Sequence, residues 1–186
     1  MKIILGSKSP RRKDLLTLLG YEFEIRVKET DESFPQTIPV TEVAQLIAEK
    51  KANDILCDLQ DDEIVICADT TVVIDNHILG KPINRAEAIA MLQKLSGREH
   101  HVITGVVVCS RYKKICFSVT TKVMFKPLNE EEISYYVDTY APYDKAGSYG
   151  IQEWIGGTAI QWIHGSYNNV VGLPTHEVYL ALKEFE

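Results

Sequence analysis

The chain has 186 residues, of which 45% are hydrophobic and 25% are charged, and its net charge is −6. These values are typical of one globular domain with a sizeable core. The acidic balance argues against a general nucleic-acid binder or a membrane-surface binder, because both present broad basic faces. The N-terminus does not resemble a signal peptide and no apolar run is long enough for a membrane span, so we expect a cytoplasmic protein.

The first residues predict a strand, a tight turn and a helix in direct succession. Ile3–Leu5 is an apolar run, and Gly6–Lys8 has the small residues that let backbone N–H groups approach a ligand. A helix is expected from about Ser9 to Leu19, because the Ser9 hydroxyl can cap the first turn and Pro10 suits the first helical position. A helix N-terminus therefore follows directly on a small-residue turn.

The first turn of this helix carries Arg11 and Arg12, although the positive end of a helix dipole favours acidic residues. A local rule broken without an evident local gain indicates a functional site. The strand, the turn, the helix N-terminus and the two guanidinium groups together predict a site for a polyanion such as a triphosphate.

A second strand is predicted over Glu22–Val27, followed by a polar segment with two prolines over Lys28–Pro39. This segment is expected to form a loop or a lid, and it carries Glu32. A long helix is then expected from Thr41 to about Leu59.

Lys51 falls inside the apolar arc of this long helix. At helical period, the arc consists of Ala44, Ile47, Ala48, Ala52, Ile55 and Leu59. Lys50 lies at the edge of the arc, so Lys51 is the residue that breaks the pattern. Two interpretations stay open: the stem of Lys51 passes its apolar neighbours to reach water, or its ammonium group serves a site.

Asp69 is framed by residues of core character. The apolar run Ile64–Ala68 predicts a buried strand, and apolar character resumes over Val72–Ile74 before a hairpin turn at Asp75–His77. A buried carboxylate is costly unless it is paired, hydrogen-bonded or bound to a metal. Asp69 is therefore a candidate site residue, and a structural ion pair is the alternative.

The remaining elements mix helices with an antiparallel pair of strands. They are a helix over Asn84–Leu95, strands over His101–Ser110 and Lys114–Lys126, a helix over Glu130–Tyr140 capped by Asn129, a strand over Ala159–His164 and a helix from about Pro174 to Phe185. This order predicts an α/β (α+β) fold around a mixed sheet.

Spacing excludes several familiar sites. Lys8-Ser9 lacks the upstream glycines of a Walker A loop, and Gly147–Gly150 has the wrong spacing for a nucleophile elbow. The adjacent His100 and His101 point to opposite faces of a strand and are expected to be structural. The cysteines show neither paired C-x-x-C spacing nor a disulfide framework, so buried free thiols are expected at Cys57, Cys67, Cys109 and Cys116.

Dispersed carboxylates and cations remain as candidates. They are Glu32, Asp69 and Asp144 on one side and Arg11, Arg12, Lys51, Lys81 and Lys145 on the other. Phosphoryl or nucleotidyl transfer needs this combination, because a divalent cation prefers oxygen ligands, a triphosphate needs positive charge and water needs a base. Separate surface ion pairs are the alternative that these residues leave open.

Several motifs occur in an order and spacing that resemble the Maf family of nucleoside triphosphate pyrophosphatases. The motifs are Ser7-x-Ser9-Pro10-Arg11-Arg12, Asp69-Thr70, Leu79-Gly80-Lys81-Pro82, Leu95-Ser96-Gly97, Asp144-Lys145-Ala146-Gly147-x-Tyr149-Gly150-Ile151-Gln152, and Gly165-Ser166-Tyr167 to Val171-Gly172-Leu173-Pro174. The resemblance covers nearly the whole chain. It implies a single domain over residues 1–186 with two lobes around a central cleft, and an elongated, twisted, mixed sheet flanked by helices, as in inosine triphosphatase.

The resemblance also implies a reaction and its residues. A nucleotide is hydrolysed between its α- and β-phosphates with a divalent cation, Mg²⁺, Mn²⁺ or Co²⁺. The implied catalytic set is Asp69 as the base, Glu32 as the second acidic residue, Lys51 and Lys81, with Glu32 and Asp69 as metal partners. The implied substrate-binding set is Ser7, Arg11, Arg12, Thr70, Lys145 and Gln152, in which Arg12 binds phosphate and Arg11 helps to select the base.

The residues Arg11, Thr70 and Gln152 match the family branch that acts on dTTP and UTP. The Gln152 amide can donate to the 4-carbonyl of thymine or uracil and accept from N3–H, whereas cytosine presents the opposite pattern. Two departures stand out: Cys67 and the Glu153-Trp154 pair occupy positions where glycine is common.

Two further hypotheses belong to other classes. One is a nucleotide-sensing regulator of cell division and septum formation that binds without turnover. The other is a pyrophosphatase for modified bases such as methylated pyrimidines or 7-methyl-GTP. The resemblance further implies a homodimer, and no nucleic-acid or membrane partner is expected.

Overall fold

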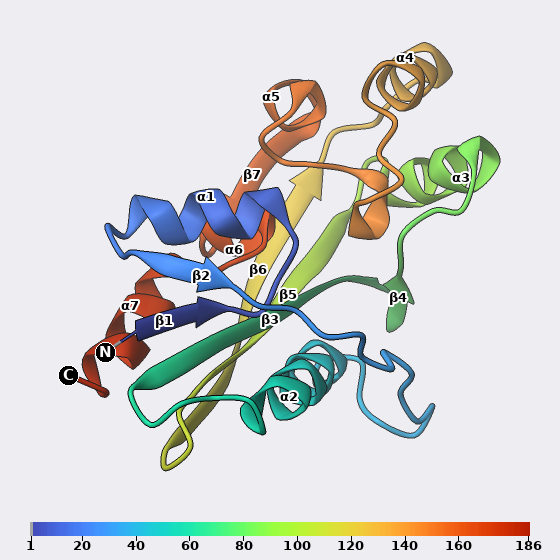
Figure 1. Cartoon of the computed structure of the whole chain (residues 1–186). Helices are drawn as coiled ribbons and strands as arrows, with labels where there is room; N and C mark the ends of the chain where they lie inside the picture. The colour runs from blue at the N-terminus through green and yellow to red at the C-terminus, as the bar shows by residue number, and fades with distance from the viewer. Residues whose placement is uncertain (1) are drawn as a thin grey trace. The chain divides into compact units, whose positions relative to one another are not determined.

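A computed structural model of the protein describes residues 2–186. Its strands form a seven-stranded sheet in the order β2-β1-β3-β5-β6-β7, with β4 paired to β3 (Figure 1). The strands are β1 Lys2–Leu5, β2 Phe23–Ile25, β3 Glu63–Ile74, β4 His77–Leu79, β5 Glu99–Cys109, β6 Lys114–Phe125 and β7 Ile160–His164. Because β1 runs parallel to β2 and β3 while β4 and β7 pair antiparallel, the predicted mixed sheet is confirmed.

Helices of very different length connect these strands. They are α1 Pro10–Leu18, α2 Val43–Leu56, α3 Arg85–Leu95, α4 Glu130–Tyr140, the short 3₁₀ helix η1 Ala146–Ser148, α5 Trp154–Ala159, α6 Tyr167–Val171 and α7 Thr175–Lys183. The α/β (α+β) prediction is therefore confirmed. The sequence prediction missed η1, α5 and α6, which all lie in the glycine-rich last third of the chain.

The chain divides into two compact units. The first comprises the residues up to Thr70 together with Thr104–Val119 and Gly172–Glu186, and the second comprises Thr71–Ile103 and Thr120–Val171. The strands β3, β5 and β6 each run through both units.

In the first unit, the buried strand β1 lies between β2 and β3 (Figure 1). The ladder continues past the strand end, because the Gly6 N–H donates to the Ile66 carbonyl at 2.8 Å. Glycine is needed at this point, since a Cβ at Gly6 would lie 2.3 Å from the Cys67 sulfur. The turn predicted after β1 is thus fixed by close packing on β3.

Helix α1 begins at Pro10, close to the predicted start, but its predicted cap is wrong. Ser9 has the extended backbone of an N-cap, yet its hydroxyl makes no capping hydrogen bond. The Ser7 hydroxyl instead accepts the Ser9 N–H at 3.2 Å. This contact turns the Ser7 oxygen toward the start of the helix.

Helix α2 begins at Val43, two residues later than predicted, and its apolar arc is confirmed. Ala48, Ala52 and Ile55 are buried in one cluster with residues of β1, β3 and β5, and Ala44 of the same arc is buried too. The arc positions Lys51 on the inner side of the helix, where 18% of its side chain is exposed against 33% for Lys50.

Strand β3 is longer than predicted. The ladder runs without interruption from Glu63 to Ile74, so Asp69 and Thr70 lie within the strand rather than after it. The predicted hairpin follows, with φ of 51° at Asp75 and 59° at Asn76. Positive φ at both central residues is the type I′ geometry that matches strand twist.

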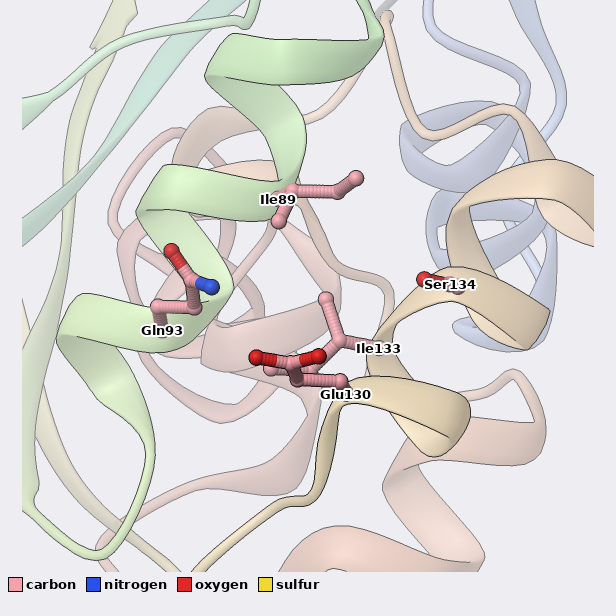
Figure 2. Close-up of a pocket in the computed structure, with 5 residues that line it drawn as sticks. All are labelled: Ile89, Gln93, Glu130, Ile133 and Ser134. Atoms are coloured by element: carbon pink, nitrogen blue, oxygen red, sulfur yellow. The ribbon is translucent and has the colours of Figure 1, made fainter.

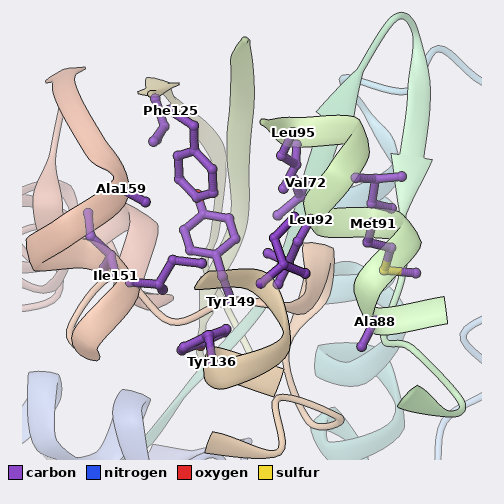
Figure 3. Close-up of a cluster of buried hydrophobic side chains, with 14 of the residues drawn as sticks. Val72, Ala88, Met91, Leu92, Leu95, Phe125, Tyr136, Tyr149, Ile151 and Ala159 are labelled. Atoms are coloured by element: carbon purple, nitrogen blue, oxygen red, sulfur yellow. The ribbon is translucent and has the colours of Figure 1, made fainter. Parts of the chain in front are cut away.

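The second unit has its own core of aliphatic and aromatic side chains (Figure 3). His100 packs edge-on against Phe125 and Tyr149, with ring centroids 5.0 and 5.5 Å away, and its Nε2 lies 2.8 Å from the Tyr149 hydroxyl. Burial lowers the pKa of His100 to about 4, so the ring is neutral at physiological pH. The prediction of a structural role is confirmed for His100.

Local capping rules hold at two helix starts of this unit. The Asn84 side chain accepts the Glu87 N–H, and Asn129 forms a reciprocal capping box with Glu132. Both caps agree with the predicted starts of α3 and α4. The cysteines agree only in part, because all four thiols are free but Cys57 is exposed and Cys116 is only partly buried.

Candidate functional site

The Arg12 side chain is held by hydrogen bonds to three different segments of the first unit. Its Nε donates to the Gly172 carbonyl at 2.9 Å, and its two terminal nitrogens donate to Thr70 Oγ1 at 3.1 Å and to Ser7 Oγ at 3.4 Å. Thr70 Oγ1 in turn shares a hydrogen bond of 3.0 Å with the buried Thr104. These contacts hold one guanidinium at the junction of α1, β3 and the segment before α7.

The partners of Arg12 are neutral, and this determines what the group can do. Burial lowers the pKa of the guanidinium from its usual value, while the negative charge of Asp69 counteracts that effect. A carbonyl and two hydroxyls satisfy three of the five N–H groups without supplying a counter-charge. A partly buried cation of this kind is stabilised by an anionic ligand that reaches the remaining N–H groups.

Gly172 contributes its carbonyl through a backbone that other residues adopt poorly. Its φ is +135°, within the left-handed half of conformational space that favours glycine. A Cβ at this position would lie 3.8 Å from Thr70 Oγ1 and 3.9 Å from Arg12 Nε. The conformation, more than the space, therefore explains the glycine.

Lys51 bridges two carboxylates in the same unit. Its Nζ lies 2.7 Å from Glu32 Oε1 and 2.7 Å from Asp69 Oδ1. The Asp69 side chain is only 16% exposed, whereas Glu32 is 53% exposed on its loop. Of the two interpretations of Lys51, the structure shows that the ammonium group contacts candidate site residues.

The loop that carries Glu32 is fastened to α2 by several polar contacts. Lys50 Nζ donates to the carbonyls of Asp31 and Ser33, at 3.1 and 2.6 Å, and so binds the backbone on both sides of Glu32. Thr30 Oγ1 donates to Asp54 Oδ2 at 2.6 Å one turn further along the helix. The loop prediction is confirmed, and α2 sets the position of the Glu32 carboxylate.

In the second unit, Lys145 is a largely buried cation with carboxylate partners. Its Nζ lies 2.8 Å from Asp144 Oδ1 and 3.0 Å from Glu153 Oε1, and its side chain is 10% exposed. The Gln152 side chain is exposed on the turn next to Glu153. Lys81 is exposed too, and none of the described residues forms an ion pair with it.

The sequence matches the family model described as Maf-like protein over residues 2–185. The chain belongs to this family.

Curated relatives cover nearly the whole of this Maf-like chain. It is 49% identical over 185 residues to a dTTP/UTP pyrophosphatase of Parabacteroides distasonis, and the aligned region covers 99% of this chain and 96% of the relative. It is 49% identical to a protein of the same name from Flavobacterium psychrophilum, with 97% and 93% covered. A third relative of that name, from Porphyromonas gingivalis, is 48% identical, with 99% and 94% covered.

Solved structures show the same fold at low sequence identity. A HAM1 protein from Coxiella burnetii is 15% identical, with a TM-score of 0.50 and 99% of both chains covered. The Ham1 protein of Staphylococcus aureus is 12% identical, with a TM-score of 0.51, and 67% of this chain and 72% of that one are covered. These similarities concern the fold alone, and they agree with the predicted inosine triphosphatase-like sheet.

In this Maf-like protein, the first unit brings together most of the residues that the sequence singled out. Arg12 contacts Ser7 and Thr70, and Lys51 joins Glu32 to Asp69. Arg11 follows the same N-cap on α1. Lys81, Lys145 and Gln152 belong to the second unit. The roles of all these residues remain predictions.

Sequence reasoning missed several side chains that hold the candidates in place. Thr104 supports Thr70, Lys50 supports the Glu32 loop, and Tyr136 and Glu153 support the turn that carries Gln152. Glu153 did give a signal, because it departs from the family pattern. The other three gave none, since their partners are distant in sequence.

No cluster of three or more His, Cys, Asp or Glu side chains within residues 2–186 is arranged to hold a metal, and no helix among them is long and apolar enough to cross a membrane. A shallow hollow of about 260 Å³ between α3 and α4 is lined by Ile89, Gln93, Glu130, Ile133 and Ser134 (Figure 2). It contains no residue of the predicted site.

Proposed function

We propose that this protein hydrolyses dTTP and UTP to the nucleoside monophosphate and pyrophosphate. The observation that carries the proposal is the Arg12 guanidinium, which is partly buried and hydrogen-bonded only to neutral groups, in the same unit as a lysine that joins two carboxylates. Relatives at 48 to 49% identity over nearly the full chain are named dTTP/UTP pyrophosphatase, which supports the choice of substrate.

Arg12 and Ser7 are proposed to bind the phosphates. Each of the three guanidinium nitrogens donates one hydrogen bond to the protein, so the second N–H of each terminal nitrogen can form a charge-assisted hydrogen bond to a phosphate oxygen. The first turn of α1 adds the partial positive charge of its N-terminus and contains no acidic residue that would compete. Lys81 is assigned to the phosphates by its motif alone.

A divalent cation, Mg²⁺, Mn²⁺ or Co²⁺, is proposed as cofactor. The donor set fits such an ion, because Glu32 and Asp69 both direct a carboxylate oxygen at the positively charged Lys51 ammonium, and hard cations prefer oxygen ligands. Glu32 and Asp69 would hold the ion, which would supply positive charge against the charge that develops on the phosphates.

Asp69 is proposed as the base that accepts a proton from the attacking water. Lys51 holds its Oδ1, and the position within β3 fixes the carboxylate in direction. The other oxygen forms no hydrogen bond within the described chain, so it can receive the proton. As the bond between the α- and β-phosphates breaks, the neighbouring cations stabilise the leaving pyrophosphate.

Base selection is proposed for Gln152 with Arg11 and Thr70. The exposed Gln152 amide offers a donor and an acceptor that match the 4-carbonyl and N3–H of thymine and uracil. Cytosine would leave these groups mismatched, and mismatched polar groups give strong discrimination. Thr70 also bonds to Arg12, so a change at Thr70 would affect phosphate binding too.

The experiment that tests the proposal is a panel of nucleoside triphosphates assayed for kcat/KM with Mg²⁺, Mn²⁺ and Co²⁺. We expect pyrophosphate release to be fastest with dTTP and UTP. Turnover of no triphosphate with any of the three metals would refute an enzyme, and binding with intact nucleotide would then favour the sensing hypothesis. A clear preference for a methylated pyrimidine or 7-methyl-GTP would refute only the substrate.

A further inference from the structure

We propose that Glu153 is a positioning residue for base selection. Its carboxylate, held by Tyr136 and Lys145, fixes the turn Gly150–Glu153 that presents the Gln152 amide. The inference rests on the proposed function, in which Gln152 contacts the base. Glu153 does not touch the nucleotide in this scheme, and it acts through the backbone of the turn.

The turn itself is defined by one backbone hydrogen bond. The Glu153 N–H donates to the Gly150 carbonyl at 3.0 Å, so Ile151 and Gln152 are the central residues of a four-residue turn. Ile151 is buried in the core of the second unit, and Gln152 is exposed. The direction of the Gln152 side chain is therefore set by the two ends of the turn.

Both ends of the turn are bound to a single buried hydroxyl. Tyr136 from α4 is fully buried, and its oxygen accepts the Gly150 N–H at 3.0 Å. The same hydroxyl donates to Glu153 Oε2. Burial and the contact with Glu153 raise the pKa of Tyr136, so it keeps the proton that it donates. Residues 150 and 153 are thereby tied together through a side chain as well as through the backbone.

Lys145 fixes the second oxygen of Glu153. The distance from its Nζ to Glu153 Oε1 is 3.0 Å, and the two side chains are 10% and 18% exposed. Each carboxylate oxygen thus has a different partner, which leaves the carboxylate one orientation. A largely buried pair of this kind is weak evidence for stability, and we infer that its role here is to select one arrangement of its neighbours.

Glycines on both sides leave the turn little room to shift. A Cβ at Gly150 would lie 3.0 Å from the Glu153 carboxyl carbon and 3.1 Å from Gln152 Nε2. A Cβ at Gly156 would lie 1.7 Å from the Ile151 carbonyl oxygen, so the start of α5 packs directly on the turn. Because this packing confines the Ile151 end of the turn while the Glu153 carboxylate holds the other end, loss of the carboxylate is expected to change the orientation of the Gln152 side chain.

The test compares Glu153→Ala, Glu153→Gln and Tyr136→Phe with the wild type. The matched control is Glu131→Gln, which removes a carboxylate from the exposed first turn of α4. The kcat and KM values for dTTP and dCTP are measured, together with the dissociation constants of both nucleotides in EDTA, where no turnover occurs. Thermal unfolding of each variant shows that it is folded.

We expect Glu153→Ala to lower the preference for dTTP over dCTP by about tenfold, mainly through KM and the dissociation constant for dTTP. Glu153→Gln retains an oxygen for the Tyr136 hydroxyl and should recover part of the preference, and Tyr136→Phe should lose a similar part. The control should equal the wild type. If Glu153→Ala does not fold, the decision rests on Tyr136→Phe, which deletes one oxygen.

An unchanged preference in the folded variants would overturn the inference, as would an equal loss of kcat for both nucleotides with unchanged binding. A wild type that binds both nucleotides equally would overturn it too. Each of these outcomes includes a binding measurement, because the dissociation constants are determined without turnover. Failure of the proposed function would appear instead as absence of pyrophosphate release by the wild type.

Discussion

The two ionic side chains Arg12 and Asp69 are both drawn away from solvent, but their partners give them different uses. Asp69 forms an ion pair with Lys51, with 2.7 Å between Oδ1 and Nζ, so its carboxylate has a counter-charge in the absence of a ligand. Arg12 is bonded to a carbonyl and two hydroxyls, so its charge calls for an anion. The Lys51–Asp69 ion pair and the Arg12 cation without an anionic hydrogen-bond partner lie in one unit, and this arrangement is consistent with a polyphosphate-binding site.

Asp69→Asn is expected to lower kcat by about 10²- to 10⁴-fold, the range that a general base contributes. The amide keeps the shape and a hydrogen-bonding oxygen for Lys51, so the fold should persist. Steady-state kinetics on the best triphosphate of the panel and a circular dichroism spectrum measure the two effects. Asp138→Asn, which breaks an exposed pair with Arg85, is the control. Activity of Asp69→Asn within about threefold of wild type would remove Asp69 from its proposed role.

Gly6→Ala is expected to destabilise the protein by about 1–3 kcal/mol, because its Cβ would lie 2.3 Å from the Cys67 sulfur and 3.0 Å from Ile55 Cδ1. Urea unfolding measures the loss. Gly157→Ala is the matched control, since nothing lies within 4 Å of a Cβ there. Adding Cys67→Ala to Gly6→Ala should cost less than the sum of the two single changes. Strict additivity would show that the sulfur is not the obstacle.

At the residue scale, the sequence predicted the direction of a side chain where the helical or strand period determines it. Lys51 breaks the apolar arc of α2, so helical geometry alone turns it inward. Thr104 and Tyr136 could not be found in this way. Their partners, Thr70 and Glu153, are 34 and 17 residues away, and only the folded chain brings these hydroxyls together.

Among the elements, β3 shows why the strand continues past Ala68, where the sequence predicted its end. Asp69 and Thr70 interrupt an apolar run, but Lys51 and Arg12 satisfy their side chains within the first unit, so the ladder continues through them. Helix α5 shows the opposite error. The sequence Trp154–Ala159 contains two glycines and has low helix propensity, yet Gly156 is what allows the helix to approach the Ile151 carbonyl.

The start of β3 supports a prediction about pH. Arg26 binds both oxygens of the buried Glu63 at 2.7 and 2.8 Å, and the Gln60 N–H adds a third hydrogen bond. These contacts lower the pKa of Glu63 from its usual 4.5 to about 2, and the hydrogen bonds from Arg26 make the largest contribution. Because the unfolded chain binds this proton more readily, the stabilisation is complete above about pH 5 and is lost as pH falls toward about 2.

Glu63→Gln should therefore unfold at a lower urea concentration than wild type at pH 7, and the difference between the two proteins should shrink from about pH 5 downward. Urea midpoints at several pH values between these limits measure the effect. Glu24→Gln, which breaks an exposed pair with Lys2, is the control and should follow the wild type. A difference that stays constant down to pH 3 would contradict the depressed pKa.

At the scale of the whole molecule, the fold class followed from the order of elements, because βα units and a hairpin joined through Arg111–Lys113 require a mixed sheet. The division into two units could not be read from the sequence. The boundaries fall inside β3, β5 and β6, where nothing in composition or linker character changes. Strands that continue through a boundary transmit hydrogen bonding along their length, so we expect the two units to unfold as one.

The chain carries natural probes for this last prediction. Both tryptophans, Trp154 and Trp162, belong to the second unit, whereas the buried thiols Cys67 and Cys109 belong to the first. In urea, tryptophan fluorescence and the reaction of buried thiols with a disulfide reagent should give the same midpoint. Cys57→Ser removes the thiol that is exposed at the outset. Glu63→Gln, a change confined to the first unit, should shift both midpoints equally, and a shift of the thiol midpoint alone would show two units that unfold independently.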